Sequence, residues 1–188
     1  KEAMGATVVA TTAEPLCLRR VPGVKRDTSR SSFGDACNAN ARVNQHGGDI
    51  QQLVAEAFLQ EGKTFFGADL SLQNGGGVRT DLPAGPITVK DVYTLLPFKN
   101  TLVQLNATGQ EIKDALEDAL EGVVGPALNT GCYPYAGGLR WQVDLNRPKG
   151  QRFSQLEIRG ADGSYQPFEL GRSYKVATIS FLADGNDS

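Results

Sequence analysis

The spacing of apolar residues changes partway along the chain, and this change limits the folds it can adopt. In residues 50–58 and again in residues 112–120, apolar residues recur at intervals of three and four, which is typical of a helix with one buried face. After residue 138 the interval becomes two, as in Leu139, Trp141, Val143 and Leu145, which is typical of a half-buried strand. Helices mixed with strands, followed by a strand-rich end, predict an α+β fold.

Three helices are expected from end signals and apolar spacing. The first starts at Asp49, with Gln52 reaching back as a variant capping box, and ends at Gly62. A short one follows Thr88 and stops at Pro97, with Val89, Val92, Tyr93 and Leu96 facing inward. The third opens at Thr108 with Glu111 three positions later, which is a clear capping box.

Strands are expected at residues 7–10, 68–73, 101–105, 139–145, 153–158 and 173–179, and Asp162-Gly163 predicts a turn between two of them. The rest of residues 1–47 reads as irregular and polar. We see no repeat and no linker, so the 188 residues predict one domain.

Charge and hydropathy exclude some partners. The net charge is −2, so no basic field predicts nucleic-acid binding. No apolar run approaches the roughly 20 residues that a membrane span needs. With 40% hydrophobic residues, the chain can bury a core.

The chain is poor in groups that perform chemistry. Its single histidine, His46, stands beside two glycines and reads as a loop or helix-entry residue. Neither His46 nor Cys17, Cys37 and Cys132 has metal-ligand spacing. We therefore expect no catalytic residue and no metal ligand in this chain.

A run of three glycines, Gly75, Gly76 and Gly77, stands between Asn74 and Arg79. Consecutive glycines after a strand can adopt positive φ and let the backbone lie against a ligand, with amide groups as donors. The phosphate-loop pattern is absent. A tight structural turn is the alternative interpretation.

The stretch that follows makes the run more informative. Residues 74–120 carry N-G-G-G-V-R, then D-L-P-A-G-P-I-T, L-P-F-K-N-T-L and T-G-Q-E-I, and residues 174–187 read YKVATISFLADGND. With residues 131–159, this order of motifs resembles the C-terminal domain of the 5′-nucleotidase family, in its bacterial branch of UDP-sugar hydrolases and NAD nucleotidases. The resemblance spans roughly residues 14–188.

The resemblance implies a two-domain enzyme. A calcineurin-like N-terminal domain would hold two divalent metal ions, Zn or Mn, and the catalytic groups. Residues 1–188 would be a fragment, the substrate-binding C-terminal domain, cut short at its end and built as a four-layer α/β/β/α sandwich. Its partners would be that N-terminal domain and a nucleotide of the AMP, NAD or UDP-sugar class.

The resemblance also assigns the binding residues. Phe98 and Phe181 would sandwich the base, Asn74 and Arg79 of the Gly75–Gly77 loop would lie near ribose and phosphate, and Asp187 would hold the sugar hydroxyls. The chemistry agrees, because aromatic faces stack bases and arginine matches a phosphate bidentately. Phe98 in the core is the alternative to stacking.

Two parts of the match are less close. The final motif has Asn186 and Ser188 where the family has glycines, so Asp187 could be a turn residue. The family also has an arginine upstream of the first long helix, and Arg42 stands near the right distance, with Arg19 and Arg20 as alternatives.

The three cysteines leave one unpaired. Three reduced thiols are one possibility. The family's extracytoplasmic members favour the other, a Cys17–Cys37 disulfide with Cys132 free, and with it a periplasmic, secreted or cell-surface location.

Two functions remain as hypotheses, with a weaker third. The first is the nucleotide-recognition domain of a secreted or periplasmic 5′-nucleotidase, inactive by itself. The second is a non-catalytic nucleotide- or nucleoside-binding module. The third is a structural surface domain with a non-functional pocket.

Overall fold

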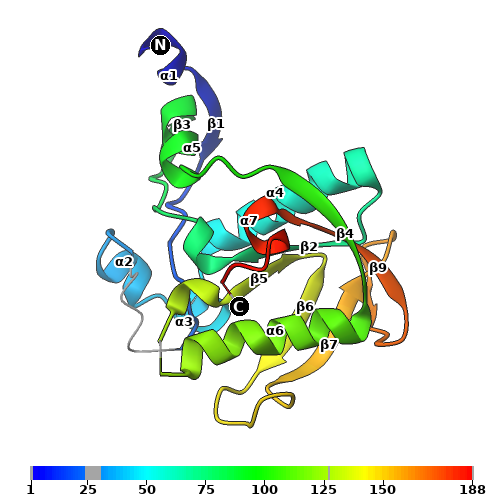
Figure 1. Cartoon of the computed structure of the whole chain (residues 1–188). Helices are drawn as coiled ribbons and strands as arrows, with labels where there is room; N and C mark the ends of the chain where they lie inside the picture. Colours follow the sequence, from blue (N-terminus) through cyan, green and yellow to red (C-terminus); the bar gives the residue numbers. More distant parts are fainter. Residues whose placement is uncertain (1, 24–30, 127, 188) are drawn as a thin grey trace.

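The computed structural model describes residues 2–23, 31–126 and 128–187 (Figure 1). Its helices are α1 (Glu2–Gly5), α2 (Asp35–Asn38), α3 (Ala41–His46), α4 (Asp49–Phe66), α5 (Val89–Leu95), α6 (Gly109–Val124) and α7 (Ser180–Ala183), with 3-10 turns η1 (Gly75–Gly77) and η2 (Thr130–Cys132). Its strands are β1 (Val8–Thr12), β2 (Leu70–Asn74), β3 (Gly85–Thr88), β4 (Leu102–Thr108), β5 (Pro134–Gly137), β6 (Leu139–Val143), β7 (Phe153–Arg159), β8 (Tyr165–Pro167) and β9 (Ser173–Ile179).

A four-stranded sheet in the order β4-β9-β2-β5 forms the centre. The central pair β2 and β9 is parallel, whereas the other pairs are antiparallel. Helix α4 covers one face, where the Ser71 hydroxyl donates to the Ala55 carbonyl at 2.5 Å. Gly62 lets α4 approach closely, because a Cβ there would lie 2.5 Å from the Ala177 methyl.

The other face of this sheet packs against α6 and a three-stranded sheet in the order β6-β7-β8 (Figure 1). The shared core is apolar and contains Leu70, Val176, Leu116, Leu120 and Phe153. Only Gly138 separates β5 from β6, so one chain segment passes from the first sheet into the second. The mixed α+β class is confirmed.

A smaller two-stranded sheet projects from this body at the N-terminal end of the chain (Figure 1). It pairs β1 with β3 in antiparallel fashion, and α1 and α5 lie beside it. This arm keeps Val8, Val9 and Tyr93 exposed.

The strongest local signals are confirmed. Thr108 and Glu111 form the predicted capping box of α6, in which the Thr108 hydroxyl accepts from the Glu111 amide at 3.2 Å. The six expected strands are all present within two or three residues of their predicted ends. Gly163 has φ of 84°, as the predicted turn requires.

The expected ends of α4 were wrong. Gly62 lies inside the helix, which continues to Phe66 and ends at the left-handed Gly67. Gly48 is the N-cap and makes no side-chain cap, so the predicted Asp49–Gln52 box does not form. Gly62 is explained by packing and not by helix termination, because α4 passes so close to Ala177 that residue 62 has no room for a side chain.

Two further expectations were wrong. On α5 only Leu95 is fully buried, and Val92 and Tyr93 are exposed, because only the C-terminal end of this helix meets the hydrophobic cluster that contains Val78 and Ile87. The N-terminal 47 residues also contain α1, α2 and α3, and Asn40 caps α3 through its side chain. These helices are only four to six residues long, too short for an apolar repeat to reveal them.

The predicted disulfide joins Cys17 and Cys37, whose Cα atoms lie 5.5 Å apart, and Cys132 is free and buried. Part of the loop that it closes, residues 24–30, lies outside the described residues. The bond sits in its own small cluster with Val43 and Phe33, next to the start of α4.

Candidate nucleotide-binding site

The glycine loop lies in the interior of the protein, directly after β2. Gly75, Gly76 and Gly77 form the turn η1 and are all buried, and the Gly75 amide donates to the Tyr133 carbonyl at 2.8 Å. None of the three has positive φ, so that expectation was wrong. A Cβ on Gly77 would lie 2.1 Å from the Gln73 amide nitrogen and 2.8 Å from Asn74 Oδ1, so this glycine is required by contacts within the protein.

Asn74 and Asp187, far apart in the sequence, meet in the structure. Asn74 is only 6% exposed, and its Nδ2 donates to Asp187 Oδ2 at 2.5 Å. The Asn129 side chain donates to the other carboxylate oxygen at 3.3 Å. Asp187 has φ of 65°, so a turn brings its side chain back to the end of β2.

Arg79 and Phe98 lie together on the other side of the loop. The Arg79 guanidinium donates to the Gly76 carbonyl at 3.0 Å and its Cζ lies 5.7 Å from the centroid of the Phe98 ring. Both side chains are exposed, Phe98 by 53%. Phe98 is therefore not a core residue, and it carries a cation beside its ring.

Phe181 lies on a segment that adjoins the one carrying Phe98. The Ser180 amide donates to the Thr101 carbonyl at 2.9 Å, and the Thr101 amide donates back to the Ser180 hydroxyl at 3.2 Å. Phe181 follows Ser180 at the start of α7 and is 38% exposed. Two exposed aromatic residues thus stand just beyond the paired ends of β4 and β9.

The arginine candidates differ in their surroundings. Arg42 is 56% exposed on α3 and forms an ion pair with Asp49 at 3.0 Å. Arg19 is buried, and its Nε donates to the Val21 carbonyl. Arg20 borders the glycine loop, because its backbone lies 3.5 Å from the position of a Cβ on Gly75.

Sequence reasoning missed Asn129 and the apolar cavity beneath Asp187. This cavity of about 190 Å³ lies between α6 and the central sheet, and Leu72, Leu116 and Val176 line it together with Cys132. Burial raises the pKa of the Cys132 thiol to about 11, and the nearby Asp187 carboxylate adds to the rise. No motif marked these positions, because they come together only through the fold.

The described residues contain no group of three or more histidine, cysteine, aspartate or glutamate side chains that could hold a metal ion. Within the same part of the chain, no helix has the length and apolarity needed to cross a bilayer. Among the described residues, the loop is surrounded by amide, guanidinium and aromatic groups and not by a cluster of metal ligands.

The geometry defines an α+β domain with an interior glycine loop, an arginine beside an exposed phenylalanine, and a second exposed phenylalanine nearby. The family model described as "5′-nucleotidase, C-terminal domain" matches residues 10–188. The chain belongs to this family.

Individual relatives agree with the family assignment. A probable 5′-nucleotidase of Treponema pallidum is 36% identical over 147 residues, 77% of this chain and 25% of the relative. The NAD 5′-nucleotidase of Haemophilus influenzae is 34% identical over 78% of this chain and 24% of its own length. This chain therefore spans about a quarter of the length of these relatives.

Among solved structures, the 5′-nucleotidase precursor of Thermus thermophilus superimposes with a TM-score of 0.76 and 33% identity, covering 99% of this chain and 32% of that one. The NAD nucleotidase of Haemophilus influenzae gives 0.75 and 26% identity, over 99% of this chain and 30% of the other.

Proposed function

We propose that this chain is the substrate-recognition domain of a secreted or periplasmic 5′-nucleotidase, and that it binds a nucleotide of the AMP, NAD or UDP-sugar class. Phe98 and Phe181 would stack the base, Arg79 would meet the phosphate, and Asn74 and Asp187 would contact the ribose. Arg42 would supply a second cation for the phosphate after its ion pair with Asp49 breaks.

One observation carries this proposal. The segments that bear Phe98 and Phe181 are held side by side by the hydrogen bonds between Thr101 and Ser180, and both rings are exposed rather than packed. Exposed aromatic rings cost solvation, so a pair of them beside a cation suits a planar ligand that carries negative charge. The guanidinium of Arg79 supplies that cation beside Phe98.

Hydrolysis would take place in a separate N-terminal metallophosphoesterase domain, in which a divalent metal pair, Zn or Mn, activates water. The described residues of this chain have no group that fits those metals, so we assign them no step of bond cleavage. They would bind the nucleotide, orient its phosphate and exclude water from the stacked base.

The disulfide supports an extracytoplasmic location. Such bonds persist in oxidising compartments, which include the periplasm and the cell surface. A periplasmic, secreted or cell-surface site of action is part of the same proposal.

Calorimetric titration of this chain with AMP and adenosine tests the binding role. Phe98→Ala should weaken both ligands roughly 5- to 150-fold, since one stacked base contributes about 1–3 kcal/mol. Arg79→Ala should weaken AMP more than adenosine. Phe65→Ala, which removes another exposed phenylalanine on α4, is the matched control and should change neither. Equal affinities of Phe98→Ala and the unaltered chain would refute the proposal.

Phosphate release tests the division of labour. With Mn²⁺ or Zn²⁺ added, this chain should release no more phosphate from AMP than buffer does. Turnover that disappears with Phe98→Ala would show that the chain itself is catalytic.

A further inference from the structure

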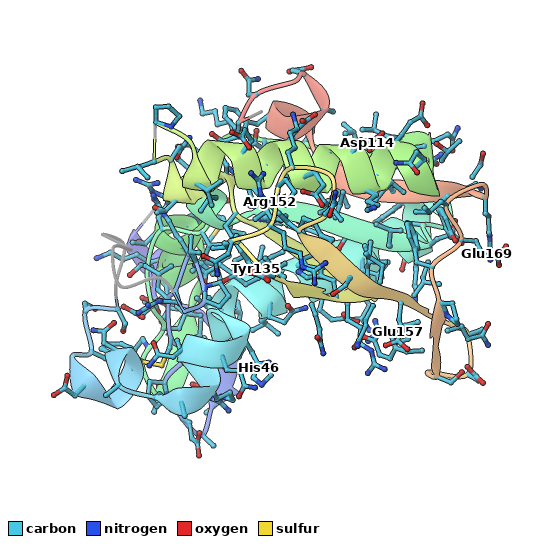
Figure 2. All side chains as sticks on the ribbon, turned by 90° about the horizontal axis from the view of Figure 1, so that it is seen from below. His46, Asp114, Tyr135, Arg152, Glu157 and Glu169 are labelled. Atoms are coloured by element: carbon cyan, nitrogen blue, oxygen red, sulfur yellow. A yellow bond between two sulfur atoms is a disulfide. The ribbon has the colours of Figure 1, made fainter. Side chains whose placement is uncertain are left out.

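A second and much larger cleft lies beyond Tyr133, the residue whose carbonyl accepts from the Gly75 amide of the glycine loop. Its volume is about 1010 Å³, at the upper end of the roughly 300–1,000 Å³ of small-molecule sites. One wall is the end of α3 with Gln52 of α4, and the other is the chain from Tyr133 to Ala136 and from Leu139 to Asn146. In Figure 2, Tyr135 on β5 lies above His46 on α3, and Glu157 on β7 lies to the right of both.

The cleft follows the open edge of a strand. β6 is an edge strand of its sheet, and all of its residues, Leu139–Val143, line the cavity, as do residues 144–146 that follow the strand. Consecutive residues point to opposite faces of a strand, so the backbone edge itself must border the cleft. Its amide and carbonyl groups add donors and acceptors to those of the side chains.

The polar side chains of the lining are mostly uncharged amides: Asn44, Gln45, Gln52, Gln142 and Asn146. Each amide has two donors and an acceptor with two lone pairs. Asn44, Gln52 and Asn146 each already use one donor within the protein, and their other groups, with those of Gln45 and Gln142, remain for a ligand. The two charged residues of the lining other than His46 already have partners. Arg140 binds Glu157 at 2.7 Å, and Asp144 pairs with Arg147 at 3.6 Å.

Aromatic rings stand among the amides and are held in place. Trp141 packs edge-on against Phe153 with ring centroids 5.4 Å apart. Tyr133 is buried in the same lining, and this burial raises the pKa of its phenol to about 12. Tyr165 is fixed by Arg140, whose guanidinium lies 4.0 Å from the ring centroid.

We propose that this cleft is a binding site for a neutral oligosaccharide. Sugar hydroxyls both donate and accept, as carboxamides do, and the partly positive C–H groups of a pyranose face suit the negative face of an aromatic ring. The described lining offers an anion only His46 and the already paired Arg140, so a nucleotide matches it poorly.

This cleft adjoins the proposed nucleotide site through Tyr133 and through α3, which carries Arg42, but the two share no proposed binding residue. Asn74, Arg79, Phe98, Phe181 and Asp187 are absent from its lining. Variants of one site therefore leave the side chains of the other unaltered.

Tryptophan emission reports on this cleft, because Trp141 is the only tryptophan of the chain. We would titrate the chain with maltotriose, cellotriose and N,N′,N″-triacetylchitotriose and follow tryptophan emission, with glycerol as a control for solvent effects. At least one sugar should give a saturable change that calorimetry reproduces. AMP should leave the emission unchanged and should not compete with the sugar.

Two variants locate the site. Gln142→Ala and Gln45→Ala, both exposed in the lining, should each weaken the sugar about 3- to 10-fold, the effect of one lost neutral hydrogen bond. Gln60→Ala, an exposed glutamine on α4 outside the lining, should have no effect. Circular dichroism spectra identical to that of the unaltered chain would show that all three fold.

Three results would overturn the proposal. One is the absence of a saturable response to all three sugars. Another is displacement of the sugar by AMP, which would place it in the nucleotide site. The third is binding of a short uncharged peptide while the sugars stay silent, which would make the β6 edge a strand-pairing surface.

Discussion

Among single residues, the glycines of the loop are needed for packing inside the protein. Gly76 faces the Gly131 backbone, and Gly77 faces the side chains of Gln73 and Asn74. The loop is therefore packed on its inner side, while Arg79 turns outward at its end. The same glycines hold Asn74 and Arg79 on opposite sides of one turn.

Gly77→Ala should destabilise the chain by about 1–3 kcal/mol, as overpacking of a tight interior does. The new methyl group would meet Gln73, which is buried and has little room to move. Urea unfolding measures the change. Gly171→Ala is the control, because a Cβ there meets nothing within 4 Å, and it should stay within about 0.5 kcal/mol.

Because the pKa of the Cys132 thiol is raised in the folded chain, we expect the free energy of unfolding to fall at alkaline pH. The thiol pKa rises from 9.0 to about 11 in the folded chain, mainly through burial. The folded state therefore favours the protonated thiol, and this contribution is complete below pH 9 and disappears as pH rises toward 11. Unfolding free energies measured from pH 8 to 11 should fall more steeply for the unaltered chain than for Cys132→Ser. Parallel curves would contradict the prediction.

Among the elements, α6 is the one that its own sequence specifies most completely. The Thr108 side chain caps the helix, and the Thr108 amide donates to the Glu111 carboxylate at 2.7 Å. The buried face of α6 packs against the shared core. These hydrogen bonds from Thr108 lower the pKa of Glu111, so its stabilising effect is present above pH 4.5 and is lost as pH falls.

Thr108→Ala should cost about 1 kcal/mol of folding free energy, because the first turn of α6 loses its side-chain acceptor. Thermal and urea unfolding at neutral pH measure it. Thr64→Ala on α4 is the control, since its hydroxyl only donates to the Gln60 carbonyl within the same helix. A Thr108→Ala chain as stable as this control would show that packing alone holds α6.

For the whole molecule, the disulfide connects the N-terminal segment to α2, and backbone and side-chain hydrogen bonds connect the same segment to α4 and to Asp81. The Ile50 amide donates to the Cys17 carbonyl at 3.4 Å, and the Leu18 amide donates to Asp81 at 2.6 Å. The bond therefore closes the segment 17–37, which carries Arg19 and Arg20 and precedes Arg42 and α4.

Reduction of this disulfide should lower the unfolding free energy by about 3 kcal/mol, the loop-entropy value for a separation of 20 residues. Urea unfolding with and without dithiothreitol measures the loss. The double variant Cys17→Ser, Cys37→Ser should be insensitive to the reductant. Equal midpoints for the oxidised and reduced unaltered chain would contradict the prediction.

The sequence by itself determined the features that depend on neighbouring residues. The capping box at Thr108, the alternation from Leu139 onward and the turn at Gly163 were all predicted, because helix ends, strand faces and tight turns follow from residues a few positions apart. The α+β class followed from their order. The motif resemblance identified the family and the disulfide.

Only the tertiary structure decided where distant groups meet. It showed that α4 continues past Gly62 and that this glycine is a packing contact. Ala177, more than a hundred residues away, occupies the space that a side chain at residue 62 would need. It placed Asp187 against Asn74 and brought the ends of β4 and β9 together, which sets the segments of Phe98 and Phe181 side by side. Such contacts depend on strand order and sheet packing, which no local pattern of residues encodes.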